Sequence, residues 1–188
     1  MPRPRSDDKR NRILGAAIRV IVTEGLRAPT MGIAREAGIA NGSLFTYFET
    51  KSELFNELYL ELKQEMASVA MRDFPKDAEL RAQFFHIWRN WGEWALRFPE
   101  KRKALAQLSV SDEITPETRA TGHTTMAAIG ELLQRVRSAG SMRKVPMGFV
   151  VALMNSVADA TMDQMIQDPG HAKAHCNNGV EALWRMVS

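Results

Sequence analysis

A short internal stretch, residues 30–55, constrains the fold of this 188-residue chain more than any other part, because it carries helix signals on both sides of a glycine. Thr30 is of a type that favours the helix N-cap, and Ile33 and Ala37 after it share one helical face. Gly38 then stands where the end of a helix needs a positive φ. The stretch therefore predicts a short helix that ends in a tight corner.

A second short helix is predicted after this corner, over residues 41–48. Leu44, Phe45 and Phe48 are expected to face inward. The residues left on or near the outer face are small and polar, apart from one tyrosine: Asn41, Gly42, Ser43, Thr46 and Tyr47. Side chains of this kind suit the major groove of DNA, so the two helices predict a helix-turn-helix that reads DNA.

A third, longer helix is predicted to begin at residue 51. Thr50 and Glu53 have the spacing of a capping box, directly before an apolar run. Lys51 falls in the first turn, beside free amides at the positive end of the helix dipole. A DNA phosphate would be held at such a place.

The segment IAREAGIANGSLFTYFETKSELF closely resembles the helix-turn-helix signature of the TetR family of bacterial transcriptional regulators. The resemblance covers roughly residues 10–58, and the rest of the chain matches only in length and helicity. In this family an amino-terminal domain binds an operator, and a carboxy-terminal domain binds ligand and dimerises. Ala40 and Asn41 depart from the family pattern, in which a Ser-Lys pair is frequent.

The resemblance implies a helix-turn-helix DNA-binding domain over residues 1–52 and a helical ligand-binding and dimerisation domain over residues 53–188. It implies a homodimer that binds a palindromic double-stranded operator, most often as a repressor, and is released by an unidentified small-molecule effector. The residues carried over to DNA contacts are Tyr47, Lys51 and Thr30 for phosphates, and Asn41, Ser43 and Thr46 for base edges, with Gly42 permitting close approach.

Composition and charge agree with this interpretation. Residues 1–52 hold nine basic and five acidic side chains, a net charge of +4, whereas the whole chain carries +3, which leaves −1 for the remainder. A basic module attracts a phosphate backbone. The hydrophobic content of 45% supports a packed core, and with neither an 18-residue apolar run nor a signal peptide, a cytoplasmic protein without a membrane span is expected.

Helical patterns fill most of the chain, and no alternating pattern predicts a strand, so the fold is predicted to be all-α. The first helix is expected over about 7–24, capped by Ser6, with Ile13, Ala17, Val20 and Ile21 buried, and the fourth over 51 to about 72. The further helices are expected near 77–97, 100–109, 116–138, 146–167 and 171–187.

Six aromatic residues between Phe84 and Phe98 allow two interpretations. They are a plain core stripe, or some of them line a ligand pocket together with polar groups. The residues proposed for the pocket are His86, Trp91, Trp94, His123, Met126, Asn155 and Asp159.

The helix expected over 146–167 is apolar around most of its circumference, which favours a partner helix as its cover. Small residues four apart allow close approach, and the last helix adds a second stripe. The residues predicted for this dimer interface are Ala152, Ser156, Ala160, Cys176, Val180 and Leu183. The alternative is an ordinary buried helix.

His171, His175 and Cys176, near Asp163 and Asp168, invite a metal hypothesis, but histidines that face solvent or the dimer seam explain them more simply. No metal, cofactor or enzyme activity is expected, because no phosphate loop, nucleophile elbow or HExxH motif is present. Two other classes stay open: a constitutive DNA-binding protein without a ligand, and a small-molecule carrier or enzyme with an attached helix-turn-helix.

Overall fold

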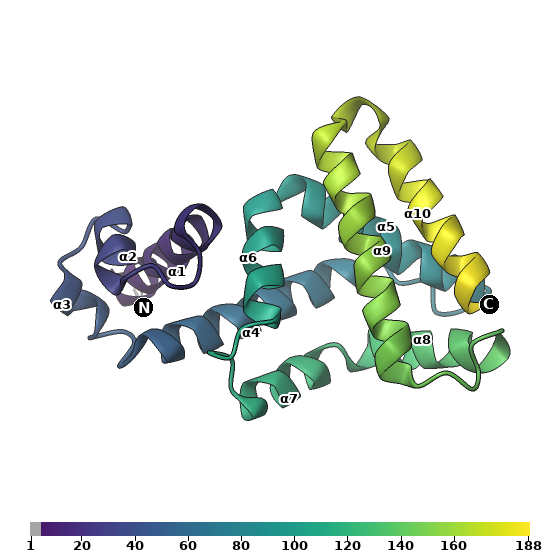
Figure 1. Ribbon diagram of the computed structural model, residues 1–188, viewed down its shortest axis with the longest axis horizontal. Helices are drawn as coiled ribbons and strands as arrows, with labels where there is room; N and C mark the ends of the chain where they lie inside the picture. Colours follow the sequence, from purple (N-terminus) through teal and green to yellow (C-terminus); the bar gives the residue numbers. More distant parts are fainter. Residues whose placement is uncertain (1–4) are drawn as a thin grey trace. The chain divides into compact units, whose positions relative to one another are not determined.

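The structure is a computed structural model that describes residues 5–188, and the side chains of residues 7–188 (Figure 1). These residues form helices and no strand, which confirms the predicted all-α fold. The helices are α1 (Arg5–Glu24), α2 (Thr30–Glu36), α3 (Asn41–Leu44), α4 (Lys51–Ala70), α5 (Leu80–Arg97), α6 (Pro99–Ser109), α7 (Pro116–Thr125), α8 (Ala127–Ala139), α9 (Met147–Gln167), the short 3-10 helix η1 (Pro169–His171) and α10 (Ala172–Val187).

Three predicted helix boundaries need correction. The first helix begins at Arg5, so Ser6 lies inside α1 and is not its cap. The helix predicted over 41–48 ends at Leu44. The helix predicted over 116–138 is two helices, because the backbone leaves helical geometry at Met126, with φ −94° and ψ 7°.

The chain folds into two compact units. Of the described residues, unit 1 contains those up to Lys63 together with Glu100–His123, and unit 2 contains Gln64–Pro99 and Thr124–Ser188. Unit 1 therefore includes α6 and most of α7, which follow the first three helices only after a long interval of sequence. The domain boundary predicted at residue 52 stays a prediction.

The core of unit 1 is built from the apolar faces of short helices. Ile13 and Ile21 of α1 are fully buried, as predicted, and α2 packs against both α1 and α3. Ile33 of α2, Leu44 of α3 and Leu54 of α4 are fully buried as well. Because α2 and α3 are too short to be stable alone, this shared core holds them in place.

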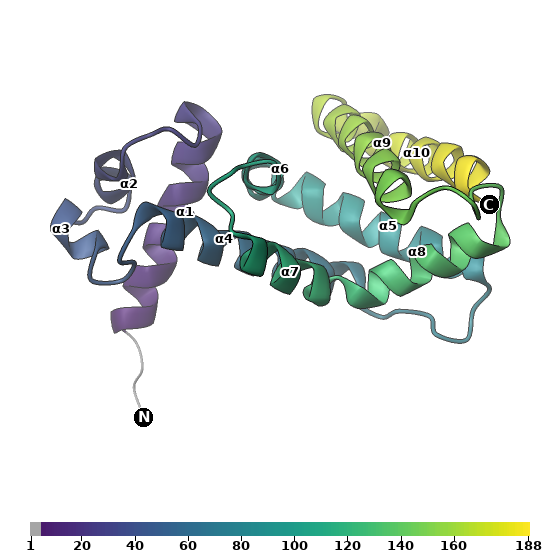
Figure 2. The same cartoon turned by 60° about the horizontal axis from the view of Figure 1, so that its bottom comes forward.

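Unit 2 is organised by α5, which packs against α8, α9 and α10. The antiparallel helices α9 and α10 lie side by side in both views (Figures 1 and 2). Trp88 of α5 donates its indole N–H to the main-chain oxygen of Cys176 at 3.1 Å, which ties α5 to α10 inside the core. Among the described helices, none has both the length and the apolar character needed to cross a bilayer.

Candidate nucleic-acid interface

The corner between α2 and α3 has the geometry that its sequence predicts. Gly38 adopts φ +66°, a left-handed conformation that costs glycine little. The amide of Ile39 donates to the carbonyl oxygen of Ala34 at 3.0 Å, and the Gly38 amide donates to that of Arg35 at 3.1 Å. These bonds close the end of α2 and direct the chain into α3.

The outer face of α3 and the turn after it presents the predicted polar residues. We call this surface the reading face, and it consists of Asn41, Gly42, Ser43 and Thr46, which are exposed, and Tyr47, which is half-buried. Leu44 and Phe48, on the opposite side, have no exposed surface. The two buried residues thus fix the orientation of the reading face.

Phe45 corrects the sequence prediction, because it was expected to face inward and its side chain is 44% exposed. The reason is that α3 ends at Leu44, one residue earlier, and the chain continues as a series of turns. Phe45 therefore lies on the surface next to Thr46. Its apolar character alone gave no signal of this, since a buried position was the natural interpretation.

The start of α4 confirms the predicted capping box, with one difference. The Glu53 amide donates to the Thr50 hydroxyl oxygen at 3.0 Å. The Glu53 carboxylate accepts a hydrogen bond from the amide of Glu49, one residue before the expected partner. Both ends of the box are therefore satisfied, and α4 begins at a defined residue.

Lys51, predicted to bind a DNA phosphate, makes two contacts within unit 1. Its Nζ donates to the carbonyl oxygen of Leu26 at 2.7 Å and lies 5.2 Å from the centre of the Phe55 ring. An ammonium group has three N–H donors, so one bond to a carbonyl leaves donors for a phosphate. The residue lies beside an open surface cleft of about 540 Å³ that Arg27 and Asp112 also line.

Thr30 does not cap α2. Pro29 occupies the N-cap position, no side chain caps this helix, and Thr30 is its first residue. Thr30 is half-buried, whereas the neighbouring Met31 is 66% exposed.

Of the residues predicted for a ligand pocket, only His86 lines the surface cleft of about 570 Å³ found on unit 2. Trp94 is 2% exposed, and its indole N–H donates to Glu65 Oε1 at 2.9 Å. His86 Nε2 lies 2.7 Å from the carbonyl oxygen of Arg72, at an open surface cleft of about 570 Å³ that Trp94 does not line. The others do not line that cleft. Trp91 packs edge-on against Trp88, Asn155 and Asp159 are exposed on α9, Met126 is at the break between α7 and α8, and His123 is exposed on α7.

The residues predicted for a dimer interface fall into two groups. Ala152, Ser156 and Ala160 are exposed along one side of α9. The three residues on α10, in contrast, are at most 6% exposed within a single chain: Cys176, Val180 and Leu183. The α10 stripe is therefore already covered by the core of unit 2, and the exposed surface is on α9.

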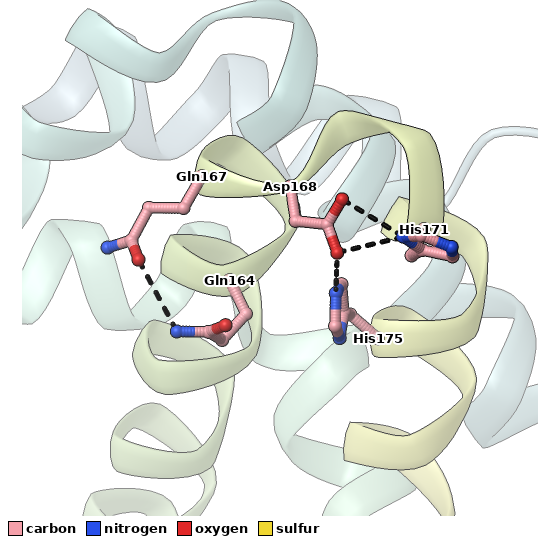
Figure 3. Close-up of polar contacts among 5 residues, drawn as sticks. All are labelled: Gln164, Gln167, Asp168, His171 and His175. Carbon is pink, nitrogen blue, oxygen red and sulfur yellow. Dashed lines mark hydrogen bonds and ion pairs between the residues drawn. The ribbon is translucent and has the colours of Figure 1, made fainter.

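The two histidines of the metal hypothesis are bonded to a carboxylate (Figure 3). His171 Nδ1 and His175 Nε2 each lie 3.0 Å from Asp168 Oδ2. The hydrogen bonds from His175 and His171 lower the pKa of Asp168. Burial raises the pKa of the Cys176 thiol, which disfavours the thiolate that binds metals. Over the described residues, no group of three or more such side chains is arranged to hold a metal ion.

Comparison with protein families finds one match at the amino-terminal end. Residues 13–58 match the model described as bacterial regulatory proteins, tetR family. The YhgD protein of Bacillus subtilis, an uncharacterized HTH-type transcriptional regulator, is 36% identical over 66 residues, which is 35% of each chain. The HTH-type transcriptional regulator AcrR of Shigella flexneri is 30% identical over 89 residues, or 44% of this chain and 41% of that protein. The chain thus spans less than half the length of these relatives.

Comparison with solved structures extends the likeness to the fold of nearly the whole chain. A tetR-family transcription regulator from Shewanella sp. PV-4 has a TM-score of 0.84 at 24% identity, with 95% of this chain and 97% of that chain covered. One from Marinobacter aquaeolei VT8 has a TM-score of 0.81 at 21% identity, with 99% and 98% covered. At these identities the likeness shows the fold alone.

Proposed function

We propose that this chain, whose residues 13–58 match the model of the tetR family of bacterial regulatory proteins, is a sequence-specific DNA-binding transcription regulator of that family. In this proposal it acts as a homodimer on a palindromic operator and is released by a small molecule. The observation that carries the proposal is the exposed polar reading face, which follows a glycine corner and is fixed from behind by the buried Leu44 and Phe48.

The reading face, together with Lys51 of α4 and Thr30 of α2, divides by chemistry into base and phosphate contacts. Asn41, Ser43 and Thr46 have short hydrogen-bonding side chains that suit base edges, and Gly42 between them allows close approach of the backbone. Tyr47 and Lys51 suit phosphates, and Thr30 is a further phosphate candidate from the resemblance.

The proposed dimer uses the exposed side of α9. Phe149, Ala152, Ser156 and Ala160 are spaced by three or four residues, and Phe149 is 56% exposed. The Ser156 hydroxyl donates to the Ala152 carbonyl of its own helix at 3.0 Å, so it makes no demand on a partner. A large apolar residue beside small ones supports close packing against the same stripe of a second copy.

Release by a small molecule follows from linkage. An effector that binds the dimer more tightly when the recognition helices are misspaced lowers operator affinity by that difference in free energy. A ligand that binds but leaves operator affinity unchanged is not the effector.

The direct test is fluorescence anisotropy of the protein on its own upstream intergenic DNA, against a scrambled duplex of equal length. We expect an affinity roughly 10³-fold higher for the upstream DNA at near-physiological salt. Equal and weak binding to both duplexes would contradict a regulator that acts on that DNA.

Two substitutions separate the proposed phosphate and base contacts. Lys51→Ala is expected to weaken binding to every duplex by about tenfold and to reduce the slope of log affinity against log salt by about one. Thr46→Ala is expected to change mainly the preference among operator variants, by about 1 kcal/mol. An equal loss for operator and scrambled DNA in Thr46→Ala would rule out its role in reading bases.

Phe45 is expected to contact the methyl group of a thymine, because it is an exposed aromatic side chain beside Thr46. Replacing each operator thymine in turn by deoxyuridine should cost the wild-type protein about fourfold in affinity at one position, which is the value of one buried methyl group. In Phe45→Ala that replacement should cost nothing further. If the affinity losses from Phe45→Ala and from each deoxyuridine replacement add at every position, Phe45 contacts no methyl group.

A further inference from the structure

The connection between α6 and α7, residues 110–115, is bound to the start of α4 through one side chain. The carboxamide of Asn56 uses both of its ends: Nδ2 donates to the carbonyl oxygen of Glu113 at 2.8 Å, and Oδ1 accepts from the amide of Thr115 at 2.9 Å. Glu113 and Thr115 are two residues apart, so the carboxamide bonds to the main chain of the connection in the same way as the backbone of a neighbouring β-strand would. We call this arrangement the Asn56 clamp.

The Asn56 clamp is also fixed to its own helix. Asn56 Nδ2 donates to the main-chain oxygen of Ser52 at 2.7 Å, and the Ser52 hydroxyl donates to the Glu113 carbonyl at 3.1 Å. The connection is therefore attached to the first turn of α4 as well as to the second.

The connection itself has little freedom. Arg119 of α7 donates to the carbonyl oxygens of Ser109 and Ser111 at 2.6 and 2.5 Å, and Ile114 is 3% exposed. The buried anchor and the arginine across its start therefore hold the connection to α6 and α7.

On its other sides, the same part of α4 is attached to the helix-turn-helix. Lys51 bonds the Leu26 carbonyl, as described above, and Arg10 of α1 forms ion pairs with Glu57 and Glu61. The first turns of α4 are thus the piece that joins the α6–α7 connection to the reading face. This agrees with the grouping of Glu100–His123 and the described residues up to Lys63 in one compact unit.

We propose that Asn56 is a positioning residue for operator binding, which holds the first turn of α4 and Lys51 at the place where they meet the DNA backbone. The inference rests on the proposed function, because it needs an operator. Hydrogen bonds to phosphate weaken steeply with distance and angle, so a small shift of this turn loses a contact.

The test compares Asn56→Ala with Asn90→Ala. Asn90 is a matched control in unit 2, because its carboxamide likewise donates to main-chain oxygens, those of Ala70 and Arg72, at 3.3 and 3.0 Å. Alanine has the highest helix propensity, so neither substitution disfavours the helix that contains it, α4 or α5. Because Ser52 still holds Glu113 in Asn56→Ala, the double variant Ser52→Ala/Asn56→Ala removes the clamp completely. Full-length proteins are titrated with upstream and scrambled duplexes over a range of salt.

Asn56→Ala is expected to lose about tenfold in operator affinity and about one unit of salt slope, with a larger loss in the double variant. Asn90→Ala should keep both values even where its melting temperature falls. The salt slope decides between a lost contact and a loss of stability. A smaller folded fraction lowers the concentration of active protein but does not change the slope of log affinity against log salt.

Two results would overturn this inference without touching the proposed function. In one, the double variant keeps the wild-type operator affinity and salt slope. In the other, its operator affinity falls but its salt slope is unchanged. Faster hydrogen exchange at the Thr115 amide checks that the clamp has opened. A wild-type protein with no preference for upstream DNA would overturn the proposed function and this inference with it.

Discussion

Replacing Trp94 by alanine is expected to lower the free energy of unfolding by about 3–5 kcal/mol, the range for removal of a large buried aromatic side chain. Trp94 is 2% exposed and is among the largest fully buried side chains of the chain's described part. Its indole N–H donates to Glu65 Oε1 at 2.9 Å, so the substitution removes a hydrogen bond as well as core volume. Urea unfolding followed by far-UV circular dichroism measures the change.

Trp91→Ala is the matched control, since it removes the same side chain from the same helix three residues earlier. Trp91 is half-buried and contacts the edge of the Trp88 ring, with 6.0 Å between ring centres. A clearly smaller loss than for Trp94→Ala is expected. If both variants lose little, Trp94 faces a cavity, as the pocket interpretation requires, and does not belong to the core.

The helix-turn-helix could be predicted from the sequence because its signals are local. The corner at Gly38 and the bond between Thr50 and Glu53 depend on residues at most five apart. Phe45 marks the limit of this reasoning. Its exposure depends on where α3 ends, and the sequence extends the helical pattern to Phe48.

The break between α7 and α8 could not be predicted, since the sequence there has no usual helix breaker. The chain leaves helical geometry at Met126, whereas the nearest glycines, Gly122 and Gly130, lie inside the two helices. Gly122 meets a different requirement: a Cβ at this position would lie 2.8 Å from the Tyr59 ring.

The Asn56 clamp could not be predicted for another reason. Asn56 and its partners are separated by 57 and 59 residues, and Glu113 and Thr115 contribute only main-chain atoms. The identity of those two residues therefore carries no trace of the contact. Only the tertiary structure shows that α6 and most of α7 belong to the same unit as the helix-turn-helix.

The apolar stripe on α10 is predicted to belong to a dimer interface, because the sequence does not distinguish a cover within the chain from a partner. Val180 and Leu183 have no exposed surface in the single chain. What identifies the cover is Gly179, where α9 approaches so closely that a Cβ would lie 2.2 Å from Thr161 Oγ1 and 2.7 Å from Thr161 Cγ2.

Gly179→Ala is therefore expected to destabilise the protein by about 3 kcal/mol, the upper part of the usual range for overpacking, although alanine favours a helix more than glycine does. Thr161 has little room to give way, because it is 8% exposed and its hydroxyl donates to the Val157 carbonyl at 2.7 Å. The same urea unfolding experiment measures the loss. Gly130→Ala is the matched control, since a Cβ there meets nothing within 4 Å, and it should be neutral or stabilise by up to about 1 kcal/mol.

A double-mutant cycle with Thr161→Ala shows whether the contact itself causes the loss. Thr161→Ala removes the two nearest atoms and leaves its Cβ at 3.0 Å, so part of the stability lost in Gly179→Ala should return. Strictly additive losses would mean that α9 and α10 do not approach each other at these residues. Because α9 carries the stripe proposed for the dimer, an altered approach should also weaken dimerisation, which sedimentation of Gly179→Ala under folding conditions would reveal.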